Sequence, residues 1–496
     1  MRCRGAPTRP LQGYTRFRAK VAHTFWRFSG RTGLTLVQVK ELQWREPDVV
    51  LSAWGQQPWC AFLDSGGKID NRSRWQIFCH NPCHTVVAWP HEIEVDGTKK
   101  PIISSDNIFE ILRIFHDELK EYAGGSCQQG IPFWGGLIGF ASYQMGMILE
   151  GVLSRHKDRN TPALAAGMYD HAFIWDRFEK RVFLAGISSF FVNELNVAQS
   201  IREWNMLPER VPSYKLHVTK PFVPDQNHAA YCQSVTQTRN YIAAGDIFQA
   251  NITCRYTTEM AKNVLSAEVY RALRQQIPAP FGAYLSCGSD FALLSSSPER
   301  FLKVDANGCV SSRPIKGTAP RGQTPEEDAF WHNALLHDEK ERAENLMIVD
   351  LMRHDIGRMA QIGSVYVPDL LVVEQFPHVH HLVSEIRGKL LPDKDVFDLL
   401  KVTLPPGSVT GAPKYRAMQI IDELEASARG AYCGTVFRIG IDGSMDSSVI
   451  IRSLEHSKNH LSIGVGGGVT ILSDPEKEYE EMRLKFAPFQ KFWGQA

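Results

Sequence analysis

The feature that most restricts the fold is a change of pattern near the middle of the chain. Residues 35 to about 191 contain short runs of β-branched and aromatic residues, such as 59–63 and 172–175, separated by Asp-Ser-Gly-Gly, Asn-Pro and similar turns. A helical stretch at 108–122 interrupts them. After His228, helical patterns alternate with long strand patterns. This distribution predicts an α+β fold built on antiparallel sheets.

With 496 residues, of which 43% are hydrophobic, the chain can form one large domain or two to three ordinary ones. We expect a basic, disordered N-terminal extension over residues 1–33, an N-terminal region over 34–210 and a catalytic region over 228–490. Polar, proline-bearing sequence from about 208 to 227 joins the last two regions.

The first 40 residues contain nine Lys or Arg and no Asp or Glu, whereas the whole chain has a net charge of +1. Such an arm can be a transit peptide, a binder of anionic surfaces or an upstream extension of the reading frame. We expect a poorly ordered tail with no role in the chemistry. The expected location is the cytoplasm, with organellar targeting by the arm as the alternative.

Several classes of protein are disfavoured by composition. No apolar run approaches the length of a membrane span, and no compact apolar segment precedes a small-residue cleavage site, so we expect neither a membrane protein nor a secreted one. Ten cysteines without a framework spacing indicate a reducing compartment. The net charge gives no indication of a nucleic-acid partner.

The segment Cys-His-Asn-Pro-Cys-His at 79–84 could ligate zinc, but it lacks a second ligand pair, and we expect a strand that ends in a proline turn.

Two segments begin with the signals of a helix. Thr324 is followed by a proline and two glutamates, so a helix should begin there, and we expect it to reach about Arg358. Asp474 is also followed by proline and glutamate, which predicts the last helix. One face of that helix carries two acids and a lysine, and such a face is usually solvated. These residues are Glu478, Glu481 and Lys485.

A single lysine, Lys316, stands between Pro-Ile and Gly-Thr, where a close turn is expected. Such a lysine can be a nucleophile or a buried cation, but most lysines beside a turn are solvated. Five further segments strengthen the functional interpretation. They are 245–249 (Gly-Asp-Ile-Phe-Gln), 297–300 (Ser-Pro-Glu-Arg), 350–358 (Asp-Leu-Met-Arg-His-Asp-Ile-Gly-Arg), 411–414 (Gly-Ala-Pro-Lys) and 466–468 (Gly-Gly-Gly).

These segments supply what a substrate with two carboxylates needs. Residues 411–413 open a helix whose free N–H groups can hold an anion, and the glycines of 464–468 let the backbone approach a ligand closely. Arg452 and Lys485 add positive charge. Glu344 and Glu481, on separate helices, could face each other across a Mg²⁺ ion that grips a carboxylate.

Together the segments resemble the chorismate-utilising family, over residues 35–496. The resemblance implies the fold of anthranilate synthase component I. In that fold two antiparallel β-sheets pack as a sandwich with helices outside, and the active site lies between the lobes. The resemblance also implies Mg²⁺ as cofactor, held by Glu344 and Glu481 on the ring carboxylate of chorismate.

The resemblance implies roles for other residues as well. Glu299 would be the general acid and base at the C4 hydroxyl, although by itself it could form a surface pair with Arg300. His381 would lie near the ring. The two carboxylates of chorismate would be bound by Ser408, Tyr432, Arg452, Lys485 and the amides around Gly466 and Gly468.

Two positions distinguish the branches of the family. Isochorismate and salicylate synthases are similar but carry a lysine, the base for water, where Gln249 stands, which disfavours addition of water. Anthranilate synthases usually read Pro-Ile-Ala-Gly-Thr, so Lys316, and with it Asn251, favours the aminodeoxychorismate branch. The implied activity is a transferase reaction that replaces the C4 hydroxyl of chorismate by an amino group, for para-aminobenzoate and folate synthesis.

The implied mechanism is covalent. Lys316 adds at C2 as the C4 hydroxyl leaves with a proton from Glu299, and ammonia then enters at C4 and expels the lysine. The attacking amine must be neutral, and we expect a confined site near Mg²⁺ and other cations to lower its pKa. The alternative is that Lys316 is only a counter-ion for a substrate carboxylate.

Ammonia must come from another protein. Neither Cys287 nor Cys433 lies in a Gly-x-Cys-x-Gly turn, so a separate glutaminase subunit, and with it a heterodimer, is implied. Some relatives hold tryptophan in the N-terminal lobe, as an inhibitor or a structural ligand, beside a segment similar to 62–65. Two other functions stay open: anthranilate synthase component I, which also eliminates pyruvate, and an inactive partner subunit that binds chorismate or tryptophan.

Overall fold

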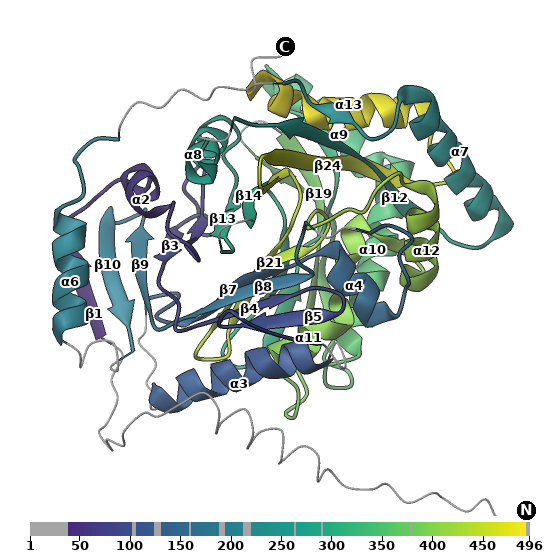
Figure 1. Ribbon diagram of the computed structural model, residues 1–496. Helices are drawn as coiled ribbons and strands as arrows, with labels where there is room; N and C mark the ends of the chain where they lie inside the picture. The colour runs from purple at the N-terminus through teal and green to yellow at the C-terminus, as the bar shows by residue number, and fades with distance from the viewer. Residues whose placement is uncertain are drawn as a thin grey trace, which may run out of the picture. The chain divides into compact units, whose positions relative to one another are not determined.

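The computed structural model describes residues 38–101, 106–123, 130–157, 160–187, 194–211, 220–261, 264–288, 291–376 and 379–492. Residues 36–496 form one compact unit. It contains two sheets of 12 strands each, whose strand pairs are antiparallel (Figure 1). The predicted extension at 1–33 lies outside the described residues, and the division into 34–210 and 228–490 stays a prediction.

The first sheet joins strands from both halves of the sequence. Its order is β1 (Gln38–Leu42), β10 (Arg181–Gly186), β9 (His171–Asp176), β3 (Trp75–Cys79), β2 (Ala61–Asp64), β13 (Phe281–Ser286), β14 (Phe291–Ser297), β23 (Ser453–Ser457), β24 (His460–Val469), β12 (Gln249–Glu259) and β11 (Val223–Pro224), and β20 (Gly411–Ala412) also pairs with β12. The two halves meet at the β2–β13 ladder, where Phe62 lies opposite Tyr284.

The second sheet is mixed in the same way. Its order is β17 (Ile315–Pro320), β19 (Val379–Lys389), β16 (Cys309–Ser312), β15 (Arg300–Val304), β22 (Met445–Val449), β21 (Thr435–Gly440), β7 (Gly136–Ala141), β8 (Leu164–Tyr169), β4 (His84–Ala88), β5 (Glu92–Val95) and β6 (Thr98–Pro101), and β18 (Tyr366–Gln375) also pairs with β19. Here the halves meet at the β7–β21 ladder.

The two sheets pack face to face. Phe140 of β7 and Phe291 of β14 come from different sheets, and their rings stack with centroids 5.4 Å apart. Both side chains are buried. The expected sandwich is therefore confirmed, and its interior supplies the hydrophobic stabilisation of the fold.

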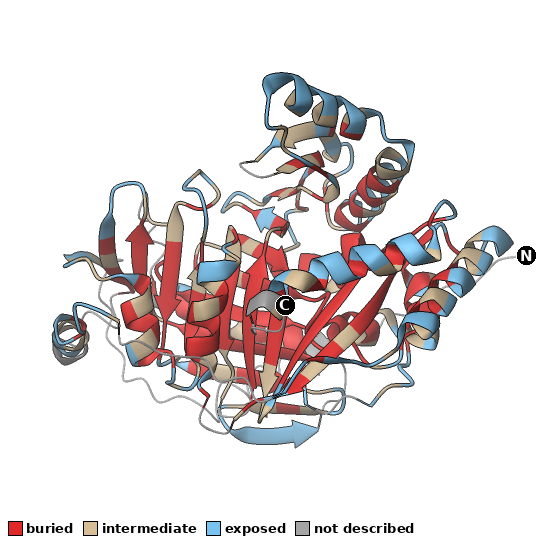
Figure 2. Ribbon diagram, turned by 90° about the horizontal axis from the view of Figure 1, so that it is seen from above, coloured by how far each residue is buried: buried red, intermediate tan, exposed pale blue. Residues whose placement is uncertain are grey.

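Helices surround the sheets, and in Figure 2 the strands are buried along most of their length while the helices have exposed outer faces. Figure 1 shows α3 beneath the strands β4, β7 and β8 of the second sheet. The helices are α2 (Pro47–Trp54), α3 (Asp106–Tyr122), α4 (Tyr143–Glu150), α6 (Glu194–Asn205), α7 (His228–Ala244), α8 (Ser266–Gln276), α9 (Pro325–His337), α10 (Glu339–Gly357), α11 (Val396–Thr403), α12 (Lys414–Leu424) and α13 (Pro475–Phe492), with a 3₁₀ turn, η1, at Gly407–Val409.

The prediction of a single helix from Thr324 to Arg358 is wrong in one respect, because the structure has two helices there. Asp338 has φ −67° and ψ 113°, which is an extended conformation that ends α9. The Asp338 side chain then accepts a hydrogen bond from the N–H of Glu341 at 2.9 Å and caps α10. The predicted start at Thr324 is confirmed, since its hydroxyl accepts from the N–H of Glu327.

The Cys-His segment at 79–84 is a strand end, as expected. β3 stops at Cys79, and Asn81 has a positive φ of 52°. His80 Nδ1 bonds the Gln57 carboxamide at 2.8 Å, and His84 Nδ1 contacts Asp96 at 2.6 Å. The described side chains of this segment form no group that could hold a metal ion.

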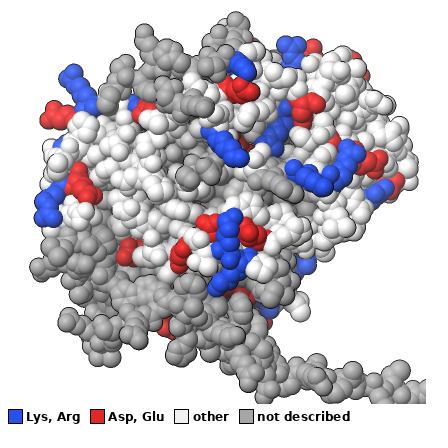
Figure 3. Space-filling model, in the orientation of Figure 1, with Lys and Arg blue, Asp and Glu red and all other residues white. Residues whose placement is uncertain are grey.

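The surface carries charges of both signs. On the face seen in Figure 3, the basic and acidic side chains of the described residues lie close to one another, often in pairs. Arg181 and Glu41, for example, form an ion pair at 2.6 Å. Among the described helices none is both long and apolar enough to cross a membrane.

Candidate active site

Glycines of β24 make room for side chains from two helices. β24 pairs with β12 so that Gly468 lies opposite Asn251. A Cβ atom at Gly468 would lie 2.3 Å from Oε1 of Glu344 on α10, and one at Gly467 would lie 3.7 Å from Oε1 of Glu481 on α13. Glycine is required at Gly468 because the Glu344 carboxylate occupies the space of a side chain.

Lys316 of β17 reaches the same carboxylate. Its Nζ lies 2.5 Å from Oε1 of Glu344, and Nε2 of Gln249 donates to that oxygen at 3.0 Å. The Lys316 and Glu344 side chains are only 12% and 8% exposed. Oε1 of Gln249 is buried and has no hydrogen-bond partner among the described residues. Lys316 is therefore a buried cation rather than a solvated one. The neighbouring Gln249 carries a hydrogen-bond acceptor, Oε1, that is not used by the described residues.

The charge state of Lys316 depends on the acids around its amine. Burial lowers the pKa of its amine, but the carboxylates of Glu344, Glu299 and Glu341 outweigh burial, so the pKa is raised above its usual value. The expected lowering depends on Mg²⁺ beside the amine, so it stays a prediction. The prediction considered nearby cations, whereas the groups that lie closest to the amine are acids.

Glu299, between β14 and β15, is close enough to Lys316 to interact with its charge. Burial raises the pKa of its carboxyl to about 7, although Lys316, the Ser408 hydroxyl and the Ile315 N–H lower it. Arg300 bonds Asp446 at 2.8 Å, so the alternative of a surface pair between Glu299 and Arg300 is wrong. A carboxyl with this pKa can give and take a proton near neutral pH.

His381 lies beside the strand that carries Lys316. Its Nδ1 lies 3.0 Å from Oγ1 of Thr318. Burial and, to a smaller extent, the charge of Arg452 lower the pKa of His381 to about 4, so the ring is neutral near pH 7. Arg452 itself is exposed and has a positive φ of 50°, a conformation that costs energy for a residue other than glycine.

Tyr432 is held on the backbone of β24. It is buried, and a Cβ at Gly464 would lie 2.2 Å from its ring. Its backbone N–H donates to Oε1 of Glu455 at 3.2 Å. The ring thus packs against the same glycine-rich strand as Glu344.

The last helix, α13, brings three charged side chains to β24. Lys485 Nζ lies 2.8 Å from Oε1 of Glu481 and donates to the carbonyl of Gly466 at 2.9 Å. Burial raises the pKa of Glu481, but Lys485, Lys340 and Lys316 lower it more, so that carboxyl stays ionised. Glu478 is buried and pairs with Lys340 at 2.9 Å. The interpretation of this face as solvated is therefore wrong for Glu478.

Two acidic residues of the site, Glu341 and Glu478, received no role from the sequence. Burial, with the charge of Glu344, raises the pKa of Glu341 to about 7. Each of the two lies three residues before a predicted metal ligand, Glu344 or Glu481. The repeated Glu-x-x-Glu spacing on α10 and α13 was the signal that could have identified them.

The geometry thus collects most predicted residues around one acidic centre. Electrostatic contacts link Lys316 with Glu299, Glu344 and Glu481. The Ser408 hydroxyl forms a hydrogen bond with Glu299 of this centre. His381 lies opposite Thr318 of β17, the strand that carries Lys316. The individual roles of these residues in binding and catalysis stay predictions.

The fold of two interleaved antiparallel sheets is shared with known enzymes. The structure of anthranilate synthase component I from Streptococcus pneumoniae TIGR4 superposes with a TM-score of 0.72 and 29% identity, covering 84% of this chain and 92% of that one. MenF, the menaquinone-specific isochorismate synthase of Escherichia coli, gives 0.69 at 17% identity, covering 97% of this chain and 100% of that one, and supports the fold alone. Residues 63–491 match the family of chorismate binding enzymes, and the chain belongs to this family.

Within the family, curated relatives point to one branch. Aminodeoxychorismate synthase component 1 of Escherichia coli (strain K12) is 36% identical over 443 residues, 89% of this chain and 95% of the relative. The same component of Bacillus subtilis (strain 168) is 34% identical, covering 77% of this chain and 81% of the relative. Anthranilate synthase component 1 of Acetivibrio thermocellus is 32% identical, covering 85% and 87%.

Proposed function

We propose that this chain replaces the C4 hydroxyl of chorismate by an amino group, giving 4-amino-4-deoxychorismate for para-aminobenzoate and folate synthesis. The observation that carries the proposal is the buried Lys316, set between Glu344 and Glu299. The similarity to aminodeoxychorismate synthase component 1 over most of the chain supports the same activity.

Lys316 and Glu299 divide the chemistry between them. The neutral amine of Lys316 forms a bond to C2 while both ring double bonds of the diene shift and the C4–O bond breaks, and Glu299 gives its proton to the leaving hydroxyl, which departs as water. Ammonia then bonds to C4, both double bonds shift back, and the C2–N bond to Lys316 breaks. Glu299 takes up the proton that ammonia loses. Two displacements return the new group to the face of the old one.

Lys316 must lose its own proton before it attacks. In the structure the amine is paired with Glu344, which holds it charged. A cation on Glu344 would compete for that carboxylate and weaken the pair, so metal binding and activation of the lysine would be coupled.

Glu344 and Glu481 are the residues that would hold Mg²⁺. Both are carboxylates, the ligand type that Mg²⁺ prefers, and they reach β24 from separate helices. Lys316 and Gln249 both donate hydrogen bonds to Oε1 of Glu344. The carboxylate oxygens of Glu344 and Glu481 are ligands of the type that fits Mg²⁺. Bound Mg²⁺ would supply positive charge to the ring carboxylate of chorismate.

Changing the two carboxylates separately tests the metal assignment. Glu344→Gln and Glu481→Gln should each raise the Mg²⁺ concentration needed for half-maximal turnover and lower the maximal rate strongly. Glu480→Gln, an exposed neighbour of Glu481, is the matched control and should leave both quantities unchanged. An unaltered Mg²⁺ dependence in both site variants would reject the assignment.

Ammonia is proposed to come from a separate glutaminase subunit. Burial raises the pKa of the Cys433 thiol to about 12 and that of Cys287 also far upward, so neither is an active nucleophile. The relatives are named as component 1 of their enzymes. The buried Oε1 of Gln249 offers an acceptor for an ammonia N–H beside Lys316.

Tryptophan is a further proposed ligand, as an inhibitor or a structural element. A cavity of about 270 Å³ lies beside the segment that suggested it. Its lining includes Leu63, Asp64, Ser65, Trp75 and Phe281.

The proposed location is the cytoplasm, because every described cysteine is a free thiol, as a reducing compartment requires.

A product assay with chorismate, ammonium and Mg²⁺ tests the function. We expect 4-amino-4-deoxychorismate, detected as para-aminobenzoate after addition of a lyase. Anthranilate fluorescence without a lyase would instead support the anthranilate synthase function. No turnover at all would support an inactive binding partner, against which the intact set of Lys316, Glu299, Glu344 and Glu481 argues.

A further inference from the structure

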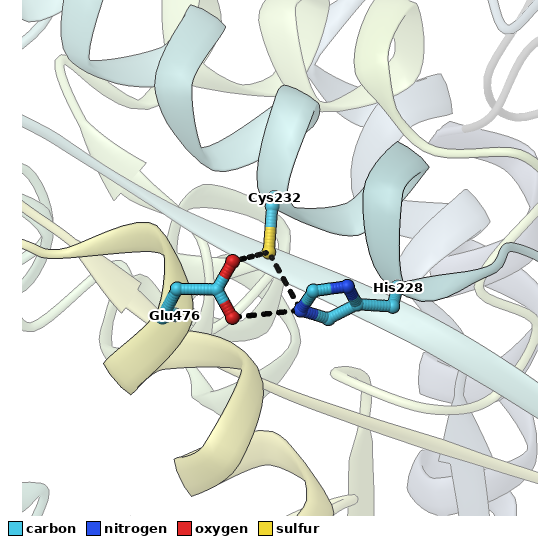
Figure 4. Close-up of side chains that lie close together, drawn as sticks. All are labelled: His228, Cys232 and Glu476. Carbon is cyan, nitrogen blue, oxygen red and sulfur yellow. Dashed lines mark hydrogen bonds and ion pairs between the residues drawn. The ribbon is translucent and has the colours of Figure 1, made fainter.

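Three potential metal ligands meet where α7 and α13 begin (Figure 4). His228 and Cys232 lie four residues apart on α7, so their side chains project from one face of the helix. Glu476 is the second residue of α13. One ligand atom from each of the three lies within 4.8 Å of the others. No other described His, Cys, Asp and Glu side chains form such a group of three.

The distances between these atoms are close to those of a zinc site. A tetrahedral Zn²⁺ with its usual bond lengths holds a nitrogen and a sulfur ligand about 3.6 Å apart, and a sulfur and an oxygen ligand about as far. Here Nε2 of His228 lies 3.6 Å from Sγ of Cys232, which lies 3.8 Å from Oε1 of Glu476. The hydrogen bond between His228 Nε2 and Glu476 involves the other carboxylate oxygen, Oε2, at 2.7 Å. Ligation through Oε1 would therefore require the carboxylate to turn until that oxygen and Nε2 lie about 3.4 Å apart.

Neighbouring groups fix both helix starts without help from these contacts. The imidazole of His228 meets the ring of Tyr479 edge-on, with centroids 4.4 Å apart. Asn227 caps α7 by accepting from the N–H of Ala230 at 2.9 Å. Asp474 caps α13 by accepting from the N–H groups of Glu476 and Lys477. The ligand positions are therefore set in advance, as a metal site requires.

We propose that His228, Cys232 and Glu476 bind Zn²⁺ or a similar borderline-soft divalent cation, with water as the fourth ligand. An imidazole and a thiolate favour such an ion over Mg²⁺, which prefers oxygen ligands, so this site is distinct from the Glu344 and Glu481 carboxylates. On binding, the thiol proton passes to solvent, and the His228 proton moves to Nδ1 so that Nε2 faces the ion.

The bound ion connects α7 to the first turn of α13. The next turns of α13 carry Glu481 and Lys485, which contact β24. Because an ion that binds only the folded chain shifts the unfolding equilibrium, Zn²⁺ should raise the thermal midpoint and fix the start of the helix that completes the acidic centre.

Cobalt(II) spectroscopy on the full chain tests the proposal directly. Co²⁺ bound by a thiolate gives an intense sulfur-to-metal charge-transfer band in the near ultraviolet. We expect this band in the unaltered chain and its loss in Cys232→Ser, with Zn²⁺ affinity at least roughly tenfold weaker in competition with a chromophoric chelator. Cys309→Ser removes an exposed thiol elsewhere and should change neither result.

Two further measurements protect the test against a folding defect. Glu476→Gln changes an exposed side chain and keeps the thiol, so it should weaken Zn²⁺ binding while the band persists at saturating Co²⁺. Zn²⁺ should also slow alkylation of Cys232 but not of Cys309, as measured by peptide mass spectrometry. Absence of the band, or equal Zn²⁺ affinity in the unaltered, Cys232→Ser and Glu476→Gln chains, would overturn the proposal and leave a hydrogen-bonded contact between two helices.

Discussion

Lys316 and Glu299 lie near each other in a buried site, yet their environments favour opposite charge states. The carboxylates around Lys316 favour its charged form, whereas burial favours the neutral form of Glu299. The resting site therefore holds a proton donor ready at Glu299 and a nucleophile that must first be released. This division suits a reaction that begins with departure of a hydroxyl group.

Replacing Lys316 by alanine should abolish turnover with free ammonia as well as with glutaminase-derived ammonia, because the covalent step is lost in both. Chorismate and Mg²⁺ should still bind. Intact-mass spectrometry of the unaltered chain, incubated with chorismate and Mg²⁺ but no ammonia, should show an adduct equal to chorismate minus water. The adduct should map to the peptide around residues 313–321.

A counter-ion would behave differently at this position. Loss of a group that stabilises the bound substrate and the transition state equally raises KM more than it lowers kcat. A Lys316→Ala enzyme with near-native kcat and no adduct in the unaltered chain would therefore refute the covalent role.

Replacing Glu299 by glutamine should stabilise the protein at alkaline pH while it removes activity. The folded-state pKa of Glu299, about 7, lies above the ordinary value of 4.5 for a glutamate, so the native state binds the extra proton and stability falls as pH rises between these values. Above pH 7, Glu299→Gln should raise the free energy of unfolding by about 3 kcal/mol, with little change near pH 4.5.

Urea unfolding at pH 5 and pH 8 checks this difference, and Glu209→Gln, at an exposed position, serves as the control. Turnover of the unaltered enzyme should fall as pH rises through about 7, because Glu299 then loses its proton. Equal stability gains at both pH values would contradict the assignment of a buried acid.

At the scale of elements, the glycines of β24 decide how closely α10 approaches the sheet. Gly468→Ala would place a Cβ 2.3 Å from Oε1 of Glu344, so the carboxylate must move. We expect a large loss of turnover and a higher Mg²⁺ requirement. Gly357→Ala, on the same helix as Glu344, meets nothing within 4 Å and should leave activity intact.

Steady-state assays at varied Mg²⁺ compare the two glycine variants, and circular dichroism checks that both retain the fold. If Gly468→Ala kept native turnover and Mg²⁺ dependence, the close packing of Glu344 against β24 would have no functional importance.

The sequence predicted helices and strands best where the signal lies within a few neighbouring residues. The cap at Thr324 and the strand at 172–175 were predicted because turn chemistry and β-branched runs act within a few residues. The break at Asp338 was missed because polar residues on both sides suit a continuous helix. Its signature, an aspartate three residues before Glu341, also occurs inside helices.

Burial of Glu478 on α13 could not be predicted in the same way. Glu478 has the spacing of a solvated face, and only contact with Lys340 and the glycine-rich β24 makes it a buried acid. Likewise the direction in which the pKa of Lys316 is shifted depends on Glu344 and Glu341, which lie on α10, a different element from the strand that carries Lys316. The sequence indicates which groups take part, but their distances follow from tertiary packing.

At the scale of the whole molecule, the compact unit of residues 36–496 is expected to work without the basic extension. A chain that starts near Gly33 should fold and turn over chorismate with ammonium at the native rate. Activity and sedimentation measurements on the truncated and full chains check this. A truncated protein that folds but does not turn over would show that the extension belongs to the enzyme, whereas altered cellular distribution alone would support a targeting role.

The interleaving of the two sheets has a consequence for synthesis on the ribosome. β21 and β22 lie at the centre of one sheet, and β23 and β24 lie in the interior of the other, between β14 and β12. A nascent chain that has emerged only as far as β19 therefore carries partial sheets with open edges, which invite aggregation. Chaperones would have to shield those edges until β21–β24 emerge. Since Glu481 and Lys485 follow these strands, a prematurely terminated chain can never become an active enzyme.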